Sequence, residues 1–268
     1  MAKSKSKPKS KLSSFIKRLI TTLVLIPVVV GCVIAGKNSV SLLALAAATL
    51  LSWEWANMLK GKSEQFFALS YLLTAAVAIM MSPYCIGLGV ILFMSCLSYF
   101  YWHKENHIFL RLLGIPYISI GISAIVAIYQ AYGTGVVLWY LSLVWCVDIG
   151  GYLFGSTLRG PKLAPKISPN KTWAGLFGGM LLAVLISWIA CCLFGSSDYT
   201  ANAVILAGIL TIIAQIGDLI ESAIKRKLGL KDSSNLIPGH GGIFDRIDGL
   251  IFAAPFALGL LKILKVVF

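Results

Sequence analysis

Acidic side chains are scarce in this sequence, and most of them lie within or at the ends of apolar segments. Of the ten Asp and Glu residues, six occupy such positions: Glu54, Asp148, Asp218, Glu221, Asp245 and Asp248. Asp218 and Glu221 are three residues apart, a spacing that places both carboxylates on one face of a helix. The same spacing separates Asp245 from Asp248. We therefore expect up to four carboxylates to converge where two neighbouring segments meet.

A group of converging carboxylates requires positive charge between its members. These acidic residues have no His or Cys companions in the pattern, and hard carboxylate oxygens of this kind suit Mg²⁺. The alternative is that they cap helix starts or form ion pairs with Lys225, Arg226 and Arg246. For the group as a whole, we predict a cation site.

The segment 158–172 combines prolines with basic and hydroxyl side chains directly before an apolar run. Lys166 and Lys171 supply point charges, and Ser168 and Thr172 supply hydrogen-bond donors. The free N–H groups at the start of the following helix favour anions. The alternative is an ordinary helix cap next to basic residues that only set the orientation in the membrane. The segment, however, contains more basic and hydroxyl side chains than a cap requires. We predict that this segment binds phosphate.

The segment 225–242 is basic and ends in a glycine-rich stretch. Its charged residues are Lys225, Arg226, Lys227, Lys231 and Asp232. Gly239, Gly241 and Gly242 surround His240 and allow backbone N–H groups to approach a ligand closely. We expect His240 to contact a phosphate or a nucleotide, or to orient a carboxylate, with a general-base role as the alternative.

The composition indicates which elements must carry these residues. Of the 268 residues, 58% are hydrophobic and 12% are charged, and the mean hydropathy is +0.87. Soluble domains contain roughly 25% charged residues, and a globule of this size cannot bury so much apolar surface. The sequence predicts an all-α, polytopic membrane protein with about nine spans. The predicted spans are 16–36, 39–59, 66–82, 84–102, 111–131, 135–157, 173–194, 201–224 and 243–265.

Basic residues are concentrated in every second segment that joins two spans, as the positive-inside rule requires. With the N-terminus in the cytoplasm, the outer segments hold Lys37 and Asp198. The inner segments hold Lys60, Lys62, Lys104, Arg111 and the basic residues of 158–172 and 225–242. This arrangement accounts for the net charge of +13 without a nucleic-acid partner. We predict a basic disordered tail over 1–15, transmembrane helices over 16–135 and a catalytic region over 136–268.

The acidic residues and the basic segments belong to one longer pattern. Residues 222–248 read Ser-x-x-Lys-Arg, then Lys-Asp, then Pro-x-His-Gly-Gly, then Asp-Arg-x-Asp. Residues 166–175 read Lys-x-Ser-Pro-x-Lys-Thr-Trp-x-Gly, and residues 215–222 read Gln-x-Gly-Asp-Leu-x-Glu-Ser. The C-terminal half thereby resembles the phosphatidate cytidylyltransferase (CDP-diacylglycerol synthase) family. The sequence departs from the family pattern at Gly151, where Ala is common, and at Ala174, where Glu is frequent.

The resemblance implies transfer of CMP from CTP to phosphatidic acid, which yields CDP-diacylglycerol and pyrophosphate. It also implies Mg²⁺, a second, monovalent cation and a homodimer, in the bacterial inner membrane with the active site facing the cytoplasm. In this hypothesis Asp218, Asp245 and Asp248 contact the metal, while Asp148 and Glu221 lie beside them or on the second cation. The other site residues hold phosphates or shape the nucleotide pocket: Lys166, Ser168, Lys171, Thr172, Ser222, Lys225, Arg226, Lys231, Asp232, His240, Gly241, Gly242 and Arg246.

Two other functions fit parts of the pattern. A CTP-dependent kinase of dolichol or phytol would share the nucleotide and the metal, but the Asp-Arg-x-Asp ending after His-Gly-Gly argues against it. An ion-coupled transporter would also place carboxylates within the membrane. Here the charges gather near one face beside large basic segments, which favours chemistry at the membrane surface.

Overall fold

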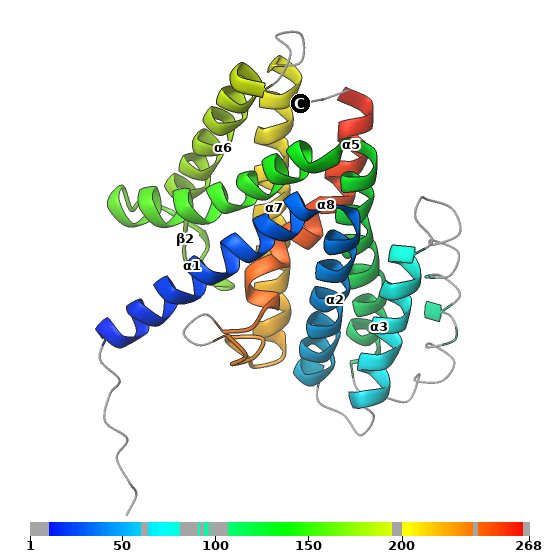
Figure 1. Cartoon of the computed structure of the whole chain (residues 1–268). Helices are drawn as coiled ribbons and strands as arrows, with labels where there is room; N and C mark the ends of the chain where they lie inside the picture. The colour runs from blue at the N-terminus through cyan, green and yellow to red at the C-terminus, as the bar shows by residue number, and fades with distance from the viewer. Residues whose placement is uncertain are drawn as a thin grey trace, which may run out of the picture.

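The computed structural model of the chain describes residues 11–59, 64–80, 107–194, 200–237 and 241–264, together with Ile91, Met94, Ser95 and Leu97. Most of these residues are helical, and the predicted all-α fold is confirmed (Figure 1). The N-terminal helices are α1 (Lys11–Ala35), α2 (Lys37–Leu59) and α3 (Glu64–Met80). They are followed by α5 (Ile108–Thr157), β1 (Lys162–Ala164), β2 (Ser168–Thr172), α6 (Trp173–Phe194), α7 (Thr200–Lys227) and α8 (Phe244–Leu264).

The helices coincide with the predicted spans. Within the described ranges, five helices are long and apolar enough to cross a membrane: α2, α5, α6, α7 and α8. The apolar stretches of α1 and α3 are shorter, Thr21–Ala35 and Ala68–Val77. The span predicted at 84–102 lies largely outside the described residues, so the total of nine spans stays a prediction. Helix α1 begins at Lys11 and so includes residues 11–15 of the predicted tail, whose residues 1–10 lie outside the description.

Helix α5 joins two predicted spans, 111–131 and 135–157, without an intervening loop. Gly133 separates its two arms with φ 79° and ψ −170°, a conformation that glycine adopts without a steric penalty. The two arms run in different directions, and the second arm extends toward the start of α6 (Figure 1). The kink therefore brings the end of α5, which carries Asp148, to the side of the fold where β1 and β2 lie.

Glycines allow the second arm of α5 to pack closely against α6. A Cβ atom on Gly150 would lie 2.7 Å from the carbonyl carbon of Gly178, and a Cβ atom on Gly179 would lie 3.1 Å from the Cα atom of Val147. Small residues are the usual means by which membrane helices approach at backbone distance. Gly150 therefore has a packing role, whereas a Cβ atom on Gly151 would meet no described atom within 4 Å.

The outer surfaces of the helices are apolar. On α6, Trp188, Leu193 and Phe194 are 53%, 68% and 77% exposed, respectively. Burying such side chains in lipid is favourable, whereas water would leave a large apolar surface uncompensated. The chain is therefore a multi-pass membrane protein whose polar groups gather inside the bundle and at its ends.

The segment between α5 and α6 forms a short antiparallel hairpin, in which β1 pairs with β2. Pro165 lies in its turn, where the N–H group of Ile167 donates to the carbonyl of Ala164 at 3.1 Å. The prolines of the sequence predict a stiffened loop at this place and do not predict the strands. They form because the two ends of a short loop, held by α5 and α6, run side by side.

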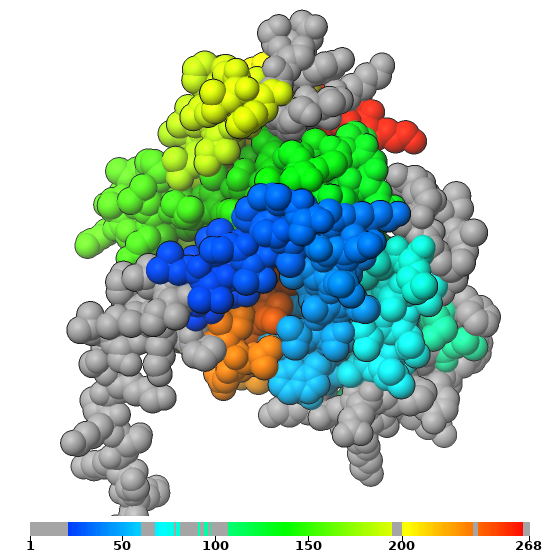
Figure 2. All heavy atoms as spheres, viewed as in Figure 1, coloured from blue at the N-terminus to red at the C-terminus, as the bar shows by residue number. Residues whose placement is uncertain are grey.

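Both arms of α5 hold the first turns of α8. The hydroxyl of Tyr117 donates to the carbonyl of Asp248 at 3.1 Å, and the hydroxyl of Tyr140 donates to the carbonyl of Leu250 at 2.5 Å. Figure 2 shows α1 and α2, in blue, over α5, with the orange segment that contains the start of α8 exposed beside them. The N-terminal helices thus support the element that carries the Asp-Arg-x-Asp sequence.

Candidate active site

Three carboxylates from two helices form the centre of the site. Ligand oxygens of Asp218 and Glu221 on α7 and of Asp248 on α8 all lie within 4.8 Å of one another. Glu221 and Asp248 are buried, whereas Asp218 is partly exposed to the adjacent pocket. The inner ends of α7 and α8 therefore meet, and carboxylates of both pairs contribute, as their spacing predicts.

Two lysines supply positive charge to this acidic group. The Nζ atom of Lys225 lies 2.6 Å from Oε2 of Glu221 and 2.5 Å from Oδ1 of Asp245, so one buried cation links α7 to α8. Lys171, at the end of the hairpin, forms an ion pair with Asp218. Ion pairing, the alternative to a cation site, is thus present for Lys225, but it occurs beside the acidic group and does not replace it.

Asp245 has a different environment from the three grouped carboxylates. Its oxygens accept hydrogen bonds from the backbone N–H of Gly242 at 2.8 Å and from that of Ser233 at 3.0 Å. The Asp245 carboxylate therefore holds the loop before α8 through these two hydrogen bonds and through its ion pair with Lys225. Of the three predicted metal ligands, Asp218 and Asp248 lie in the group, and Glu221 occupies the third position where Asp245 was expected.

The grouped carboxylates fit a divalent cation. Oε1 of Glu221 is buried and has no hydrogen-bond partner among the described residues. An unpaired carboxylate oxygen in such a place is costly, and two further carboxylates within reach add repulsion. The donor set consists of oxygens alone, which is the set that Mg²⁺ takes in proteins.

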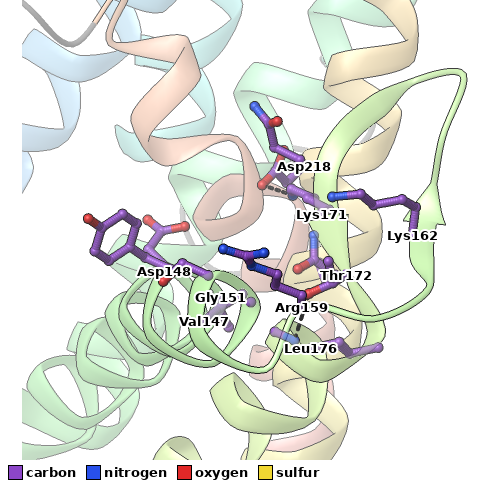
Figure 3. A pocket seen from close by; sticks show the side chains of 15 residues that line it. Val147, Asp148, Gly151, Arg159, Lys162, Lys171, Thr172, Leu176 and Asp218 are labelled. Atoms are coloured by element: carbon purple, nitrogen blue, oxygen red, sulfur yellow. Dashed lines mark hydrogen bonds and ion pairs between the residues drawn. The ribbon is translucent and has the colours of Figure 1, made fainter.

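A pocket of about 580 Å³ opens beside the acidic group (Figure 3). The end of α5, the hairpin, the first turn of α6 and α7 all contribute to its wall. Asp148 and Asp218 line it together with Lys171, and Arg159 and Lys162 extend into the same space (Figure 3). The pocket thus combines basic side chains that can bind phosphate with carboxylates that can bind a cation.

The hairpin residues of the predicted site divide into two groups. Thr172 lines the pocket, and its hydroxyl accepts the N–H of Gly175 at 3.1 Å, so it also caps α6 as the alternative interpretation holds. Lys166 is exposed and Ser168 is half-buried, and neither is among the described residues that line the pocket. Of the four hairpin residues that the sequence predicts for the site, Lys171 and Thr172 therefore line the pocket and Lys166 and Ser168 do not.

The described residues of the segment 222–242 do not line the pocket, and Ser222 and Lys225 contact the acidic group instead. The Ser222 hydroxyl is 3.4 Å from Oδ1 of Asp218, and Arg226 donates through Nε to the carbonyl of Ile167 at 3.2 Å. Arg226 thereby joins the hairpin to the end of α7. Lys231 and Asp232 are exposed.

The glycine-rich end of this segment is only partly described. Gly241 has φ 82°, and Gly242 is buried. His240 lies outside the described residues. Arg246, on the first turn of α8, is exposed.

Several residues that line the pocket were not predicted from the sequence as site residues: Tyr152, Arg159, Lys162, Asn170 and Gln215. Nε2 of Gln215 is buried and has no hydrogen-bond partner among the described residues, so it is available to a bound molecule. Its signal in the sequence was a polar side chain within the apolar α7. Glu54 was noted as an acidic residue in an apolar segment but was not placed at the site, although its carboxylate contacts the loop before α8.

The fold and the site define a polytopic membrane protein with an acidic group and a basic pocket at one end of its helices. The sequence matches the cytidylyltransferase family over residues 16–264. The chain therefore belongs to the cytidylyltransferase family.

Curated relatives with the name phosphatidate cytidylyltransferase resemble the chain over different lengths. The protein of Pseudomonas aeruginosa is 34% identical over 265 residues, which cover 91% of this chain and 96% of the relative. That of Rickettsia bellii is 39% identical over 183 residues, 65% of this chain and 79% of the relative. That of Brucella suis is 46% identical over 125 residues, which are 47% of this chain and 46% of the relative. The chain thus spans slightly less than half the length of that relative.

Proposed function

We propose that the chain is a phosphatidate cytidylyltransferase, which transfers CMP from CTP to phosphatidic acid and releases pyrophosphate. The observation that carries the proposal is the basic pocket directly beside the three grouped carboxylates, with the Lys171–Asp218 ion pair between them. The name of the Pseudomonas relative, which matches almost the whole chain, supports the same activity.

The pocket of about 580 Å³ is the site for CTP in this proposal. Arg159, Lys162 and Lys171 point into it and bind the triphosphate (Figure 3). The buried amide of Gln215 and the side chain of Asn170 are available for further hydrogen bonds. Fixed positive charge that is already in place costs no reorganisation when negative charge develops on the leaving pyrophosphate.

Asp218, Glu221 and Asp248 are the residues that we propose hold Mg²⁺. A bound magnesium ion neutralises phosphate charge and helps to orient the substrate and the leaving group. Lys225 keeps Glu221 and Asp245 from repelling each other, and Lys171 holds the position of Asp218. A second, monovalent cation near Asp148 remains part of the proposal because Asp148 faces the same pocket.

The reaction requires no strong general base. A phosphate monoester such as phosphatidic acid carries about 1.5 to 2 negative charges at pH 7, so its oxygen is already a nucleophile. That oxygen forms a bond to the α-phosphorus of CTP, while the bond from this phosphorus to the bridging oxygen breaks and pyrophosphate leaves. The protein must bring two polyanions together. The positive charges of the basic pocket residues and of Arg246 reduce the repulsion between them.

An apolar pocket next to Arg246 suits the lipid substrate. It has a volume of about 260 Å³ and lies between α1, α2, α5 and the start of α8. Val33, Ala44 and Leu141 line it, and Arg246 is the charged residue among its described lining residues. We propose that an acyl chain of phosphatidic acid occupies this pocket while Arg246 attracts the phosphate.

We further propose that the enzyme acts as a homodimer in the bacterial inner membrane, with the site open to the cytoplasm.

The proposal is tested with purified protein, phosphatidic acid and CTP labelled at either the α- or the γ-phosphate. We expect the α-label to enter the lipid and the γ-label to leave as pyrophosphate. Transfer of the γ-label to a lipid alcohol would indicate a lipid kinase, and entry of neither label into lipid would favour a transporter.

A pair of variants serves as the control for this experiment. Asp218→Asn removes one of the grouped carboxylates, and we expect its turnover to fall at least about 100-fold, since even indirect support of a metal site contributes 10- to 100-fold. Asp198→Asn removes an acidic residue from a predicted outer segment and should leave turnover unchanged. Equal turnover in both variants would contradict the assignment of the site.

A further inference from the structure

We propose that Glu54 is a positioning residue, which fixes the loop before α8 and thereby the acidic site. Glu54 belongs to α2, in the N-terminal half of the chain, and its side chain is fully buried. Its effect on turnover rests on the proposed CMP transfer, whereas its effect on the loop is independent of the reaction.

The carboxylate of Glu54 accepts hydrogen bonds from the middle of the loop between α7 and α8 and from the start of α8. The backbone N–H groups of Ile243 and Phe244 donate to it at 2.9 and 2.7 Å. The hydroxyls of Ser234 and Ser233 lie at 2.6 and 3.0 Å. Four donors thus surround one buried carboxylate, which is the condition under which such a charge is tolerated away from water.

Glu54 caps α8 from a different helix. Phe244 is the first residue of α8, so its N–H group and that of Ile243 belong to the set that has no partner inside the helix. A carboxylate at this end is also favoured by the helix dipole. The start of α8, which carries Asp245, Arg246 and Asp248, is therefore anchored to α2.

The same contact reaches the acidic group through Ser233. Its hydroxyl lies 3.0 Å from Glu54 and 3.2 Å from Asp245, and its backbone N–H donates to Asp245 at 3.0 Å. Asp245 in turn binds Lys225, which is paired with Glu221. A continuous set of charge-assisted contacts therefore connects α2 with one of the grouped carboxylates.

Gly242 provides independent support for the tightness of this contact. A Cβ atom at Gly242 would lie 2.6 Å from Oε2 of Glu54 and would collide with the hydroxyl of Ser233. Gly242 is not among the glycines with positive φ, so the close approach of the Ser233 hydroxyl and the Glu54 carboxylate, and not the backbone angle, explains the glycine at this position of the family pattern.

Aromatic packing holds the same turn from another direction. The rings of Trp55 and Phe244 have centroids 5.3 Å apart, and those of Tyr117 and Phe244 are 5.6 Å apart. Removal of the Glu54 charge therefore leaves α8 packed in the bundle and affects mainly the loop. For this reason we expect a substituted protein to fold but to position its site poorly.

The test compares Glu54→Gln with the full-length wild-type protein in detergent. The amide NH₂ group of glutamine cannot accept a hydrogen bond from an N–H group, so part of the contact becomes repulsive. We expect kcat for CMP transfer to fall about 10- to 100-fold. The KM for CTP should stay within about 3-fold, because Glu54 is not among the described residues that line the CTP pocket.

Amide hydrogen exchange provides a second readout that does not depend on activity. In Glu54→Gln, peptides that cover 241–248 should exchange faster, while peptides from α6 remain as in the wild type. Trp53→Phe serves as the matched control, since Trp53 is the preceding residue of α2 and is 46% exposed. It should leave both kcat and exchange unchanged.

The outcomes separate the two proposals. Wild-type protein without CMP transfer would refute the proposed function, and hydrogen exchange would still decide whether Glu54 fixes the loop. Unchanged turnover in Glu54→Gln would overturn the positioning role, even if the loop exchanged faster. Should this variant fail to fold, Ser234→Ala, which removes one donor, decides: slower turnover with faster exchange over 241–248 supports the inference, and wild-type values overturn it.

Discussion

At the scale of single residues, the site depends on two lysines that neutralise carboxylates in different surroundings. Lys225 is buried between Glu221 and Asp245, where it has a structural task, because removing one partner of a buried ion pair leaves an uncompensated charge. Lys171 reaches Asp218 from the hairpin and lines the open pocket. We therefore propose that Lys171 is the lysine that exchanges its carboxylate partner for a phosphate of the substrate.

This difference predicts the effect of removing the charge of Lys171. We expect Lys171→Gln to lower kcat/KM for CTP at least about 10-fold, since a charge-assisted contact to phosphate is lost. Lys227→Gln removes an exposed basic residue at the end of α7 that is not among the described lining residues, and it should stay within about 3-fold. Steady-state kinetics at several CTP concentrations measure both values, and equal losses would show that general positive charge suffices.

At the scale of elements, close packing of α5 against α6 sets the shape of the pocket. Gly150 faces the backbone of α6. At the start of α6, a Cβ atom on Gly175 would lie 3.0 Å from the carbonyl oxygen of Gly151. The end of α5 and the hairpin line opposite parts of the same pocket (Figure 3). The separation of α5 and α6 therefore determines the distance between Asp148 and Lys171.

Gly150→Ala tests this packing. An added methyl group must push the helices apart, and overpacking of this kind costs about 1–3 kcal/mol. We expect a lower temperature of thermal unfolding in detergent. Gly208→Ala, in α7, is the control, since its Cβ atom would meet no described atom within 4 Å and alanine is the better helix former. An unfolding temperature that is the same in Gly150→Ala as in the wild type would contradict the close approach of the two backbones.

At the scale of the whole molecule, the two basic segments come together at one end of the bundle. The contact between Arg226 and the carbonyl of Ile167 joins the hairpin to the end of α7, although 59 residues separate them in sequence. The acidic group lies beside both segments. The structure thus gathers charges on one side of the fold, in agreement with the asymmetry of basic residues along the chain.

The orientation in the membrane that the sequence predicts can be measured with single cysteines. In a background without native cysteines, Lys166→Cys and Lys231→Cys should react with a membrane-impermeant maleimide in inverted vesicles and be protected in spheroplasts. Asp198→Cys should show the reverse pattern. Reaction of Lys166→Cys and Lys231→Cys from opposite sides would refute both the predicted topology and the joint site.

Some features of the site were predictable because they depend on residues close in sequence. The spacing of Asp218 and Glu221 indicates one helix face, and the sequence before Trp173 indicates a helix start with anion-binding groups. The predicted convergence of acidic pairs from α7 and α8 also appears in the structure. Lys166 and Ser168 could not be distinguished from Lys171 in this way, because the three residues lie close together in sequence and only the fold decides which of them lines the pocket.

The sequence by itself determined that the chain is helical, polytopic and a member of its family, because apolar length and motif spacing are local properties of a chain. Only the tertiary structure decided that Glu221 joins Asp218 and Asp248, because helical periodicity does not specify how one helix is rotated against another. The same holds for Glu54 and Phe244, which are 190 residues apart. Their contact exists because the packing of α2 against α8 buries a carboxylate where free N–H groups require an acceptor.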